Sequence, residues 1–253
     1  MQVDRRTLLA GLPAAAMVLA APRIARAAFS PAPDISAFVE PTLVPVIGAL
    51  GRTFLARTGA PLHIFAAPSK MLIREIPFTL ADVAVLQTDA LLAADLAGNV
   101  VGPGRPVPIG LNGLVVARRG EGPAVPIEQL TVTGTLAVVD EPVPDSLGVA
   151  SHDAMRRADW PPPETKIQGV ARDADALFLL KTRAAALAIL YRTDVAADPS
   201  LSTAAVLPSP QIPLTYAAAI SAKPSSRFAA DFVEFLGSPG SIAQLRSAGL
   251  EPS

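Results

Sequence analysis

ISAFVEPT, residues 35–42, is a short apolar run that ends in a hydroxyl residue, and a helical pattern of apolar residues follows it. LHIFAAPS, residues 62–69, repeats this arrangement. The first N–H groups of a helix have no partner within the helix, so a hydroxyl there helps to form an anion site. Two such sites at the same end of neighbouring strands would converge on one ligand. Ordinary helix N-caps would equally explain Thr42 and Ser69.

Further along the chain, strand patterns alternate with helix patterns. This alternation predicts an α/β fold with a largely parallel sheet. Gly59 is expected to end the first long helix, and Ser225 and Ser238 stand where N-caps of the last two helices are expected. The expected strands are Ile35–Phe38, Leu62–Ala66, Val83–Leu86, Val107–Ala117, Thr135–Val139, Ala186–Tyr191 and Leu214–Ile220. The expected helices are Leu43–Thr58, Lys70–Ile76, Asp89–Ala94, Val149–Ala158, Asp173–Thr182, Ser226–Leu236 and Pro239–Ala248.

Residues 1–27 have the pattern of an export signal of the twin-arginine type. The paired Arg5-Arg6 precedes an apolar stretch, and Ala25-Arg26-Ala27 is a small-x-small cleavage site. The apolar stretch is shorter than the roughly 20 residues that span a bilayer, so we expect a cleaved signal rather than a membrane anchor. The mature protein is then expected in the periplasm, without stable membrane insertion.

Composition excludes several classes of function. Without residues 1–27 the chain keeps 17 basic and 21 acidic residues, a net charge of −4, and no basic patch suited to nucleic acid. It has no cysteine, which excludes disulfides and thiolate metal sites. Its 2 histidines lack metal-ligand spacing, and neither a nucleophile turn nor a phosphate loop is present. These absences argue against an enzyme, and no cofactor is expected.

Six segments carry a resemblance that runs from about Ile35 to the C-terminus. ALAILYRTDV, residues 186–195, is the most specific of them. The others are SKMLIREI (69–76), LADVAVLQTD (80–89), AVVDEPVP (137–144), LTYAAAI (214–220) and FVEFLGSP (232–239). In this order they resemble the periplasmic molybdate-binding proteins of ABC importers, within the type II periplasmic binding proteins.

The resemblance implies a two-lobed α/β fold with a ligand cleft between the lobes. Residues 34–110 and 212–253 would form the first lobe, and residues 111–211 the second. A tetrahedral oxyanion, molybdate or tungstate, would bind in the cleft through hydroxyls and backbone N–H groups, so the protein itself would supply no metal ligand. The lobes would close on it, and the protein, a monomer, would deliver it to an ABC permease.

The family's contacts fall on five positions of this chain. Its two hydroxyl residues fall on Thr42 and Ser69. A backbone N–H contact falls near Asp145 and on Ser146, and another on Asp173. The family's tyrosine falls on Tyr191, for which an interior aromatic with a satisfied hydroxyl is the other interpretation.

Several positions depart from the family pattern. Glu40 and Pro41 replace small residues before Thr42, and Pro41 has no N–H to donate. Lys70 follows Ser69, and Asp145 and Asp173 place carboxylates near the backbone contacts. These charges either lie on a solvated rim or suit a different small organic or amine-bearing ligand. A periplasmic sensor or accessory protein without a transporter is the further alternative.

Overall fold

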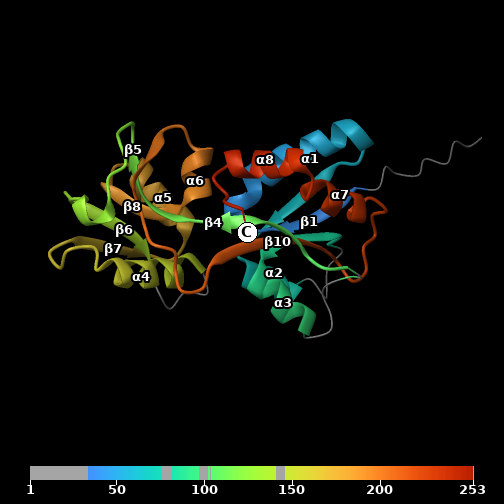
Figure 1. Ribbon diagram of the computed structural model, residues 1–253, viewed down its shortest axis with the longest axis horizontal. Helices are drawn as coiled ribbons and strands as arrows, with labels where there is room; N and C mark the ends of the chain where they lie inside the picture. Colours follow the sequence, from blue (N-terminus) through green and yellow to red (C-terminus); the bar gives the residue numbers. More distant parts are fainter. Residues whose placement is uncertain (1–33, 76–80, 97–101, 103, 141–145, 253) are drawn as a thin grey trace, which may run out of the picture. The chain divides into compact units, whose positions relative to one another are not determined.

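Two five-stranded sheets organise the computed structural model, which describes residues 34–75, 81–96, 102, 104–140 and 146–252 (Figure 1). The expected export signal, residues 1–27, lies outside the described residues. The first sheet has the order β2-β1-β3-β10-β4 and the second β7-β6-β8-β5-β9. The first contains β1 (Ile35–Val39), β2 (Leu62–Ala66), β3 (Val83–Gln87), β4 (Val107–Asn112) and β10 (Leu214–Ile220). The second contains β5 (Leu114–Arg119), β6 (Thr135–Val139), β7 (Lys166–Val170), β8 (Leu187–Tyr191) and β9 (Leu201–Val206).

Helices cover both faces of each sheet. In Figure 1, α1, α7 and α8 lie on one face of the first sheet and α2 and α3 on the other, while α4 and α5 lie on opposite faces of the second. Their bounds are α1 (Val44–Thr58), α2 (Ser69–Glu75), α3 (Thr88–Leu96), α4 (Ser146–Ala158), α5 (Asp173–Lys181), α6 (Arg192–Ala197), α7 (Ala229–Leu236) and α8 (Pro239–Ser247). The described residues also include two short 3-10 helices, η1 (Pro41–Leu43) and η3 (Ile127–Gln129). No helix among the described residues is both long and apolar enough to cross a membrane.

The predicted α/β class is confirmed, but the sheets are mixed rather than largely parallel. In the first sheet β1 pairs in parallel with β2 and β3, whereas β10 runs antiparallel to β3 and β4. In the second, β6 pairs in parallel with β7 and β8, whereas β5 runs antiparallel to β8 and β9. Each antiparallel strand belongs to a segment that crosses between the sheets.

One crossing lies inside the expected strand Val107–Ala117, which is therefore two strands. β4 ends at Asn112 and β5 begins at Leu114, in the other sheet. Gly113 lies between them, its carbonyl accepts from the Arg192 N–H at 2.9 Å, and a side chain there would collide with the Arg192 guanidinium. The chain returns to the first sheet between β9 and β10.

Two strands and one helix were not expected from the sequence. β7 is an exposed strand at the end of its sheet and shows no apolar alternation, β9 is an edge strand of small and polar residues, and α6 has only 6 residues. Gly59 ends α1 in a left-handed conformation, as predicted, and the Ser238 side chain accepts from Ser241 N–H as the N-cap of α8. The N-cap predicted at Ser225 is wrong, since α7 begins at Ala229 and Ser225 binds Asp82 instead.

Asp82 fixes three segments of the first sheet through its carboxylate. The side chain is fully buried, and Oδ2 accepts from the Ser36 N–H at 2.8 Å. Oδ1 accepts from the Ser225 N–H at 2.5 Å, the Ser225 hydroxyl at 3.0 Å and the Ser226 N–H at 2.8 Å. These donors lie in β1 and in the segment before α7. A buried charge is stable only with such a set of hydrogen bonds.

We predict that Asp82→Asn destabilises the protein by about 3 kcal/mol, because one carboxylate oxygen becomes an NH₂ group that cannot accept these bonds. Urea unfolding followed by circular dichroism measures the change. Glu121→Gln, at an exposed loop position, is the matched control and should alter stability by less than about 0.5 kcal/mol. Equal midpoints for the two variants would contradict the role given to Asp82.

Candidate functional site

A buried glutamate occupies the hydrogen-bond donors of Ser69. Glu40 follows β1 directly and is 3% exposed, and Ser69, the first residue of α2, is 1% exposed. Glu40 Oε2 accepts from the Ser69 N–H at 2.7 Å and also from the Ser69 hydroxyl. The Ser69 oxygen in turn accepts from the Gln87 N–H at 3.0 Å. Ser69 does bind an anionic oxygen, and that oxygen belongs to the chain itself.

Thr42 joins the first sheet's segments to α6. Its hydroxyl donates to Asp194 Oδ1 at 2.6 Å and shares a hydrogen bond with the Thr193 hydroxyl. Asn112, the last residue of β4, donates through Nδ2 to the Thr193 hydroxyl at 2.8 Å. Thr42, Thr193 and Asn112 are all buried. Residues far apart in sequence therefore form one polar cluster where the two sheets meet.

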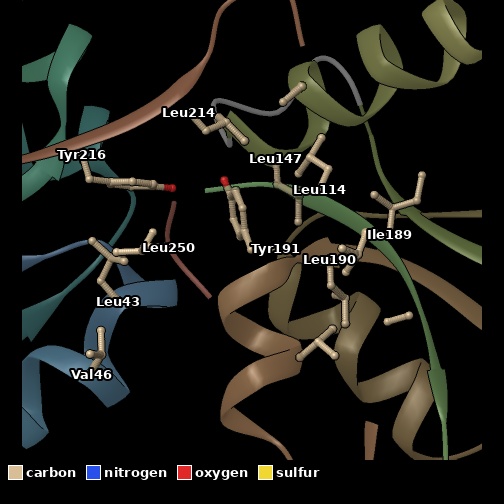
Figure 2. Close-up of a cluster of buried hydrophobic side chains, with 14 of the residues drawn as sticks. Leu43, Val46, Leu114, Leu147, Ile189, Leu190, Tyr191, Leu214, Tyr216 and Leu250 are labelled. Atoms are coloured by element: carbon tan, nitrogen blue, oxygen red, sulfur yellow. The ribbon is translucent and has the colours of Figure 1, made fainter. Parts of the chain in front are cut away.

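The chain's two tyrosines are buried near this cluster, and the charges of Glu40 and Asp194 both act on Tyr216. Figure 2 shows the hydroxyls of Tyr216, from β10, and Tyr191, from β8, directed toward one another. Tyr216 is fully buried and Tyr191 is 1% exposed. Burial raises the pKa of Tyr216 well above its ordinary value, and the negative charge of Glu40 adds to this, while interaction with Gln87 opposes it. Tyr216 therefore stays protonated at physiological pH.

The structure places the predicted site residues in two groups. Thr42, Ser69 and Tyr191 lie at the cluster just described. Ser146 is the first residue of α4, and its side chain lies outside the described residues, as does Asp145. Asp173 is the first residue of α5, where its carboxylate accepts from the Ala174 N–H at 2.6 Å, a contact local to that helix.

Beside the cluster, a pocket of about 240 Å³ opens between α2, α3 and α4. Its walls come from both sheets' helices and from the segment that returns to β10. Lys70, Asp89, Asp153 and Arg156 supply charged groups, and Gln87 connects the pocket to the buried cluster. The other lining residues are Val149, Ala150, Pro210, Gln211, Ile212, Pro213 and Leu214.

Sequence reasoning missed several members of the cluster. Asp194, Thr193 and Gln87 stand inside the segments quoted for the resemblance, but their polarity was not interpreted. Tyr216 lies in an apolar strand, where a buried aromatic is unremarkable. Glu40 is one of the charges expected either on a solvated rim or in a site for a different ligand, and its burial excludes the rim.

The two remaining chemical features of the described residues are acidic and histidine side chains outside the cluster. Within the described residues no group of three or more histidine, aspartate or glutamate side chains could hold a metal ion. His63 lies far from the cluster in β2, half exposed, with its Nε2 3.0 Å from Asp34 Oδ2. The cluster can donate and accept hydrogen bonds, which suits binding.

Comparison with known proteins gives the family. The profile of the bacterial extracellular solute-binding proteins matches residues 35–251, and the chain belongs to this family of solute-binding proteins. No curated protein matches the chain in sequence.

Solved structures agree in fold. The periplasmic molybdate-binding protein of Azotobacter vinelandii is similar with a TM-score of 0.71 and 15% identity, over 87% of this chain and 99% of that one. The substrate-binding domain of a putative molybdenum ABC transporter from Clostridium difficile has a TM-score of 0.67 and 13% identity, over 87% of this chain and 99% of that one. Peb3 of Campylobacter jejuni, with bound L-phospholactate, has a TM-score of 0.65 and 14% identity, over 87% of this chain and 100% of that one. At these identities the likeness shows the type II periplasmic binding protein fold alone.

The raised pKa of Tyr216 gives a prediction for alkaline titration. In Tyr191→Phe, Tyr216 is the only tyrosine left of the chain's 2. We expect no phenolate absorbance from the folded variant near pH 10, the ordinary pKa of tyrosine, whereas the urea-unfolded variant titrates there. The unfolded chain then binds fewer protons than the folded one, so stability falls as the pH rises above about 10. Phenolate absorbance near pH 10 with an unchanged circular dichroism spectrum would contradict this.

Proposed function

We propose that this protein is the solute-binding component of an ABC importer, exported to the periplasm, monomeric and without catalytic activity. It binds a solute between its two lobes, residues 34–110 with 212–253 and residues 111–211, and delivers it to the permease. The observation that carries the proposal is the pocket of about 240 Å³, because α2 and α3 line one wall and α4 the other. A solute between such walls favours the closed arrangement of the lobes.

The lining of this pocket fits a small organic zwitterion with an amine group. Lys70 and Arg156 offer cations to a carboxylate, and Asp89 and Asp153 offer carboxylates to an amine. Arg156 and Asp153 also form an ion pair with each other at 3.7 Å, so a solute would share these two charges. Asp153 also accepts from the Gln211 N–H at 2.7 Å, which orients it. The pocket is smaller than the roughly 300–1,000 Å³ of drug-sized sites, so the solute is of about amino-acid size.

Molybdate or tungstate is the second candidate, favoured by the hydroxyls of Thr42 and Ser69. In the structure, however, Glu40 takes both Ser69 donors and Asp194 takes the Thr42 hydroxyl. A dianion placed there would meet two carboxylates. Repulsion between like charges at close range costs several kcal/mol, which favours the organic zwitterion.

Thermal-shift titration separates these ligand classes. The panel contains the common amino acids, small amines and betaines, with molybdate, tungstate, sulfate and phosphate. We expect stabilisation by a zwitterion, by about 2.7 kcal/mol at 100 times its dissociation constant. Stabilisation by molybdate or tungstate alone, at micromolar concentration, would reject the zwitterion assignment. No response to the whole panel would reject both.

Two neighbouring arginines of α4 provide a matched pair of variants. Arg156 lines the pocket and Arg157, equally exposed, does not. We predict that Arg156→Ala weakens binding of the stabilising zwitterion by about 1.5–3 kcal/mol, the usual loss of a hydrogen bond to a charged group. Arg157→Ala should leave the affinity unchanged in the same calorimetric titration. Equal affinities of the two variants would move the binding site away from this pocket.

A further inference from the structure

We propose that Glu40 is the specificity-determining residue of this protein: its carboxylate permanently occupies the Ser69 donors and thereby excludes free oxyanions and carboxylates from them. This inference rests on the proposed solute-binding function and concerns which solutes are refused. The resemblance implies that a bound oxyanion accepts hydrogen bonds from Ser69, whereas here the Glu40 carboxylate accepts them.

The contacts define an occupied anion position. The Ser69 N–H and the Ser69 hydroxyl both donate to the same oxygen, Glu40 Oε2. The Gln87 N–H donates to the Ser69 hydroxyl oxygen at 3.0 Å, so the hydroxyl proton is directed at Glu40. Ser69 and Gln87 are 1% and 4% exposed, so water competes little for these groups. Two donors converging on one buried carboxylate oxygen are an anion site that is already filled.

The backbone keeps Glu40 in this position. Its N–H donates to the Val85 carbonyl at 3.1 Å, which continues the pairing of β1 with β3. Its carbonyl accepts from the Leu43 N–H at 2.9 Å, which begins η1. Pro41 follows it and restricts the backbone between these two bonds. The side chain therefore leaves Ser69 only by rotation about its own bonds.

Displacement of the carboxylate by a free anion is unfavourable for two reasons. The incoming anion would lie next to a like charge in a poorly solvated space. The displaced Glu40 would lose two hydrogen bonds to its charged group while it stayed buried. A neutral or amine-bearing part of a solute meets no like-charge repulsion, and it can lie beside Glu40 without displacing the carboxylate from Ser69.

Chemical rescue tests the proposal directly. Glu40→Ala removes the γ-CH₂ group and the carboxylate of the side chain. Acetate, a methyl group with a carboxylate, has about the size of the removed atoms and could bind to the Ser69 donors in their place. We expect acetate, sulfate and molybdate to raise the melting temperature of Glu40→Ala, with affinities about 100-fold above those of the wild type. A gain of this size is about that of one hydrogen bond to a charged acceptor, so it is a lower bound for an anion that takes both Ser69 donors. The double variant Glu40→Ala with Ser69→Ala should lose the gain, which locates the anion at Ser69.

Glu40→Gln separates occupation from charge. Its amide oxygen still accepts from Ser69, so we expect no response of this folded variant to acetate or sulfate. Folded Glu40→Ala without a response to any of the three anions would overturn the proposal. Wild-type binding of molybdate that Ser69→Ala abolishes would also overturn it, and that measurement needs no Glu40 variant to fold. Neither result depends on finding the zwitterion, so this inference and the proposed function fail separately.

Discussion

The burial of one carboxylate organises the ligand-binding region. Glu40 stands at 3% exposure where β1 ends, and its charge is stable there because Ser69 supplies an N–H and a hydroxyl. These two hydrogen bonds hold the start of α2 against the end of β1. The Gln87 N–H, which donates to the Ser69 hydroxyl oxygen, adds the end of β3. Three segments are thus aligned at one edge of the first sheet. The positions of Thr42 and of the pocket beside Gln87 follow from that alignment.

A second buried carboxylate has the same effect at the opposite end of the strands. Asp82 precedes β3 and binds N–H groups of β1 and of the segment before α7. Both acids accept hydrogen bonds from backbone N–H groups and serine hydroxyls, which hold a negative charge without a cation. One of them preserves the sheet, and the other lies where a solute would be expected. Similar physical chemistry therefore serves stability at one end and selection at the other.

Much of the fold could be predicted from the sequence, because periodicity and helix-ending residues are local signals. The long helices and the strands β1, β2 and β3 are evident in this way, and ALAILYRTDV is the most specific of the six segments that carry the family resemblance. The split at Gly113 could not be predicted, since the strands on its two sides pair in different sheets and the Gly113 carbonyl binds the N–H of Arg192, which is remote in sequence. Of the candidate site, the hydroxyls of Thr42 and Ser69 were recognisable, but their partners were not. Which carboxylate reaches which hydroxyl is decided by the packing of β1, α2 and α6, and no local pattern encodes it.

The crossing at Gly113 has a consequence for how the two sheets can move. Arg192 begins α6 and bonds to the Gly113 carbonyl, and its guanidinium binds the Glu251 carboxylate. The backbone of Glu251 pairs with Leu111 of β4: each N–H donates to the carbonyl of the other residue. A rotation of one sheet against the other at this crossing would therefore have to keep or break bonds that join three distant parts of the chain. Glu251 thus contributes to the connection between the two sheets, although it lies far from the crossing in sequence.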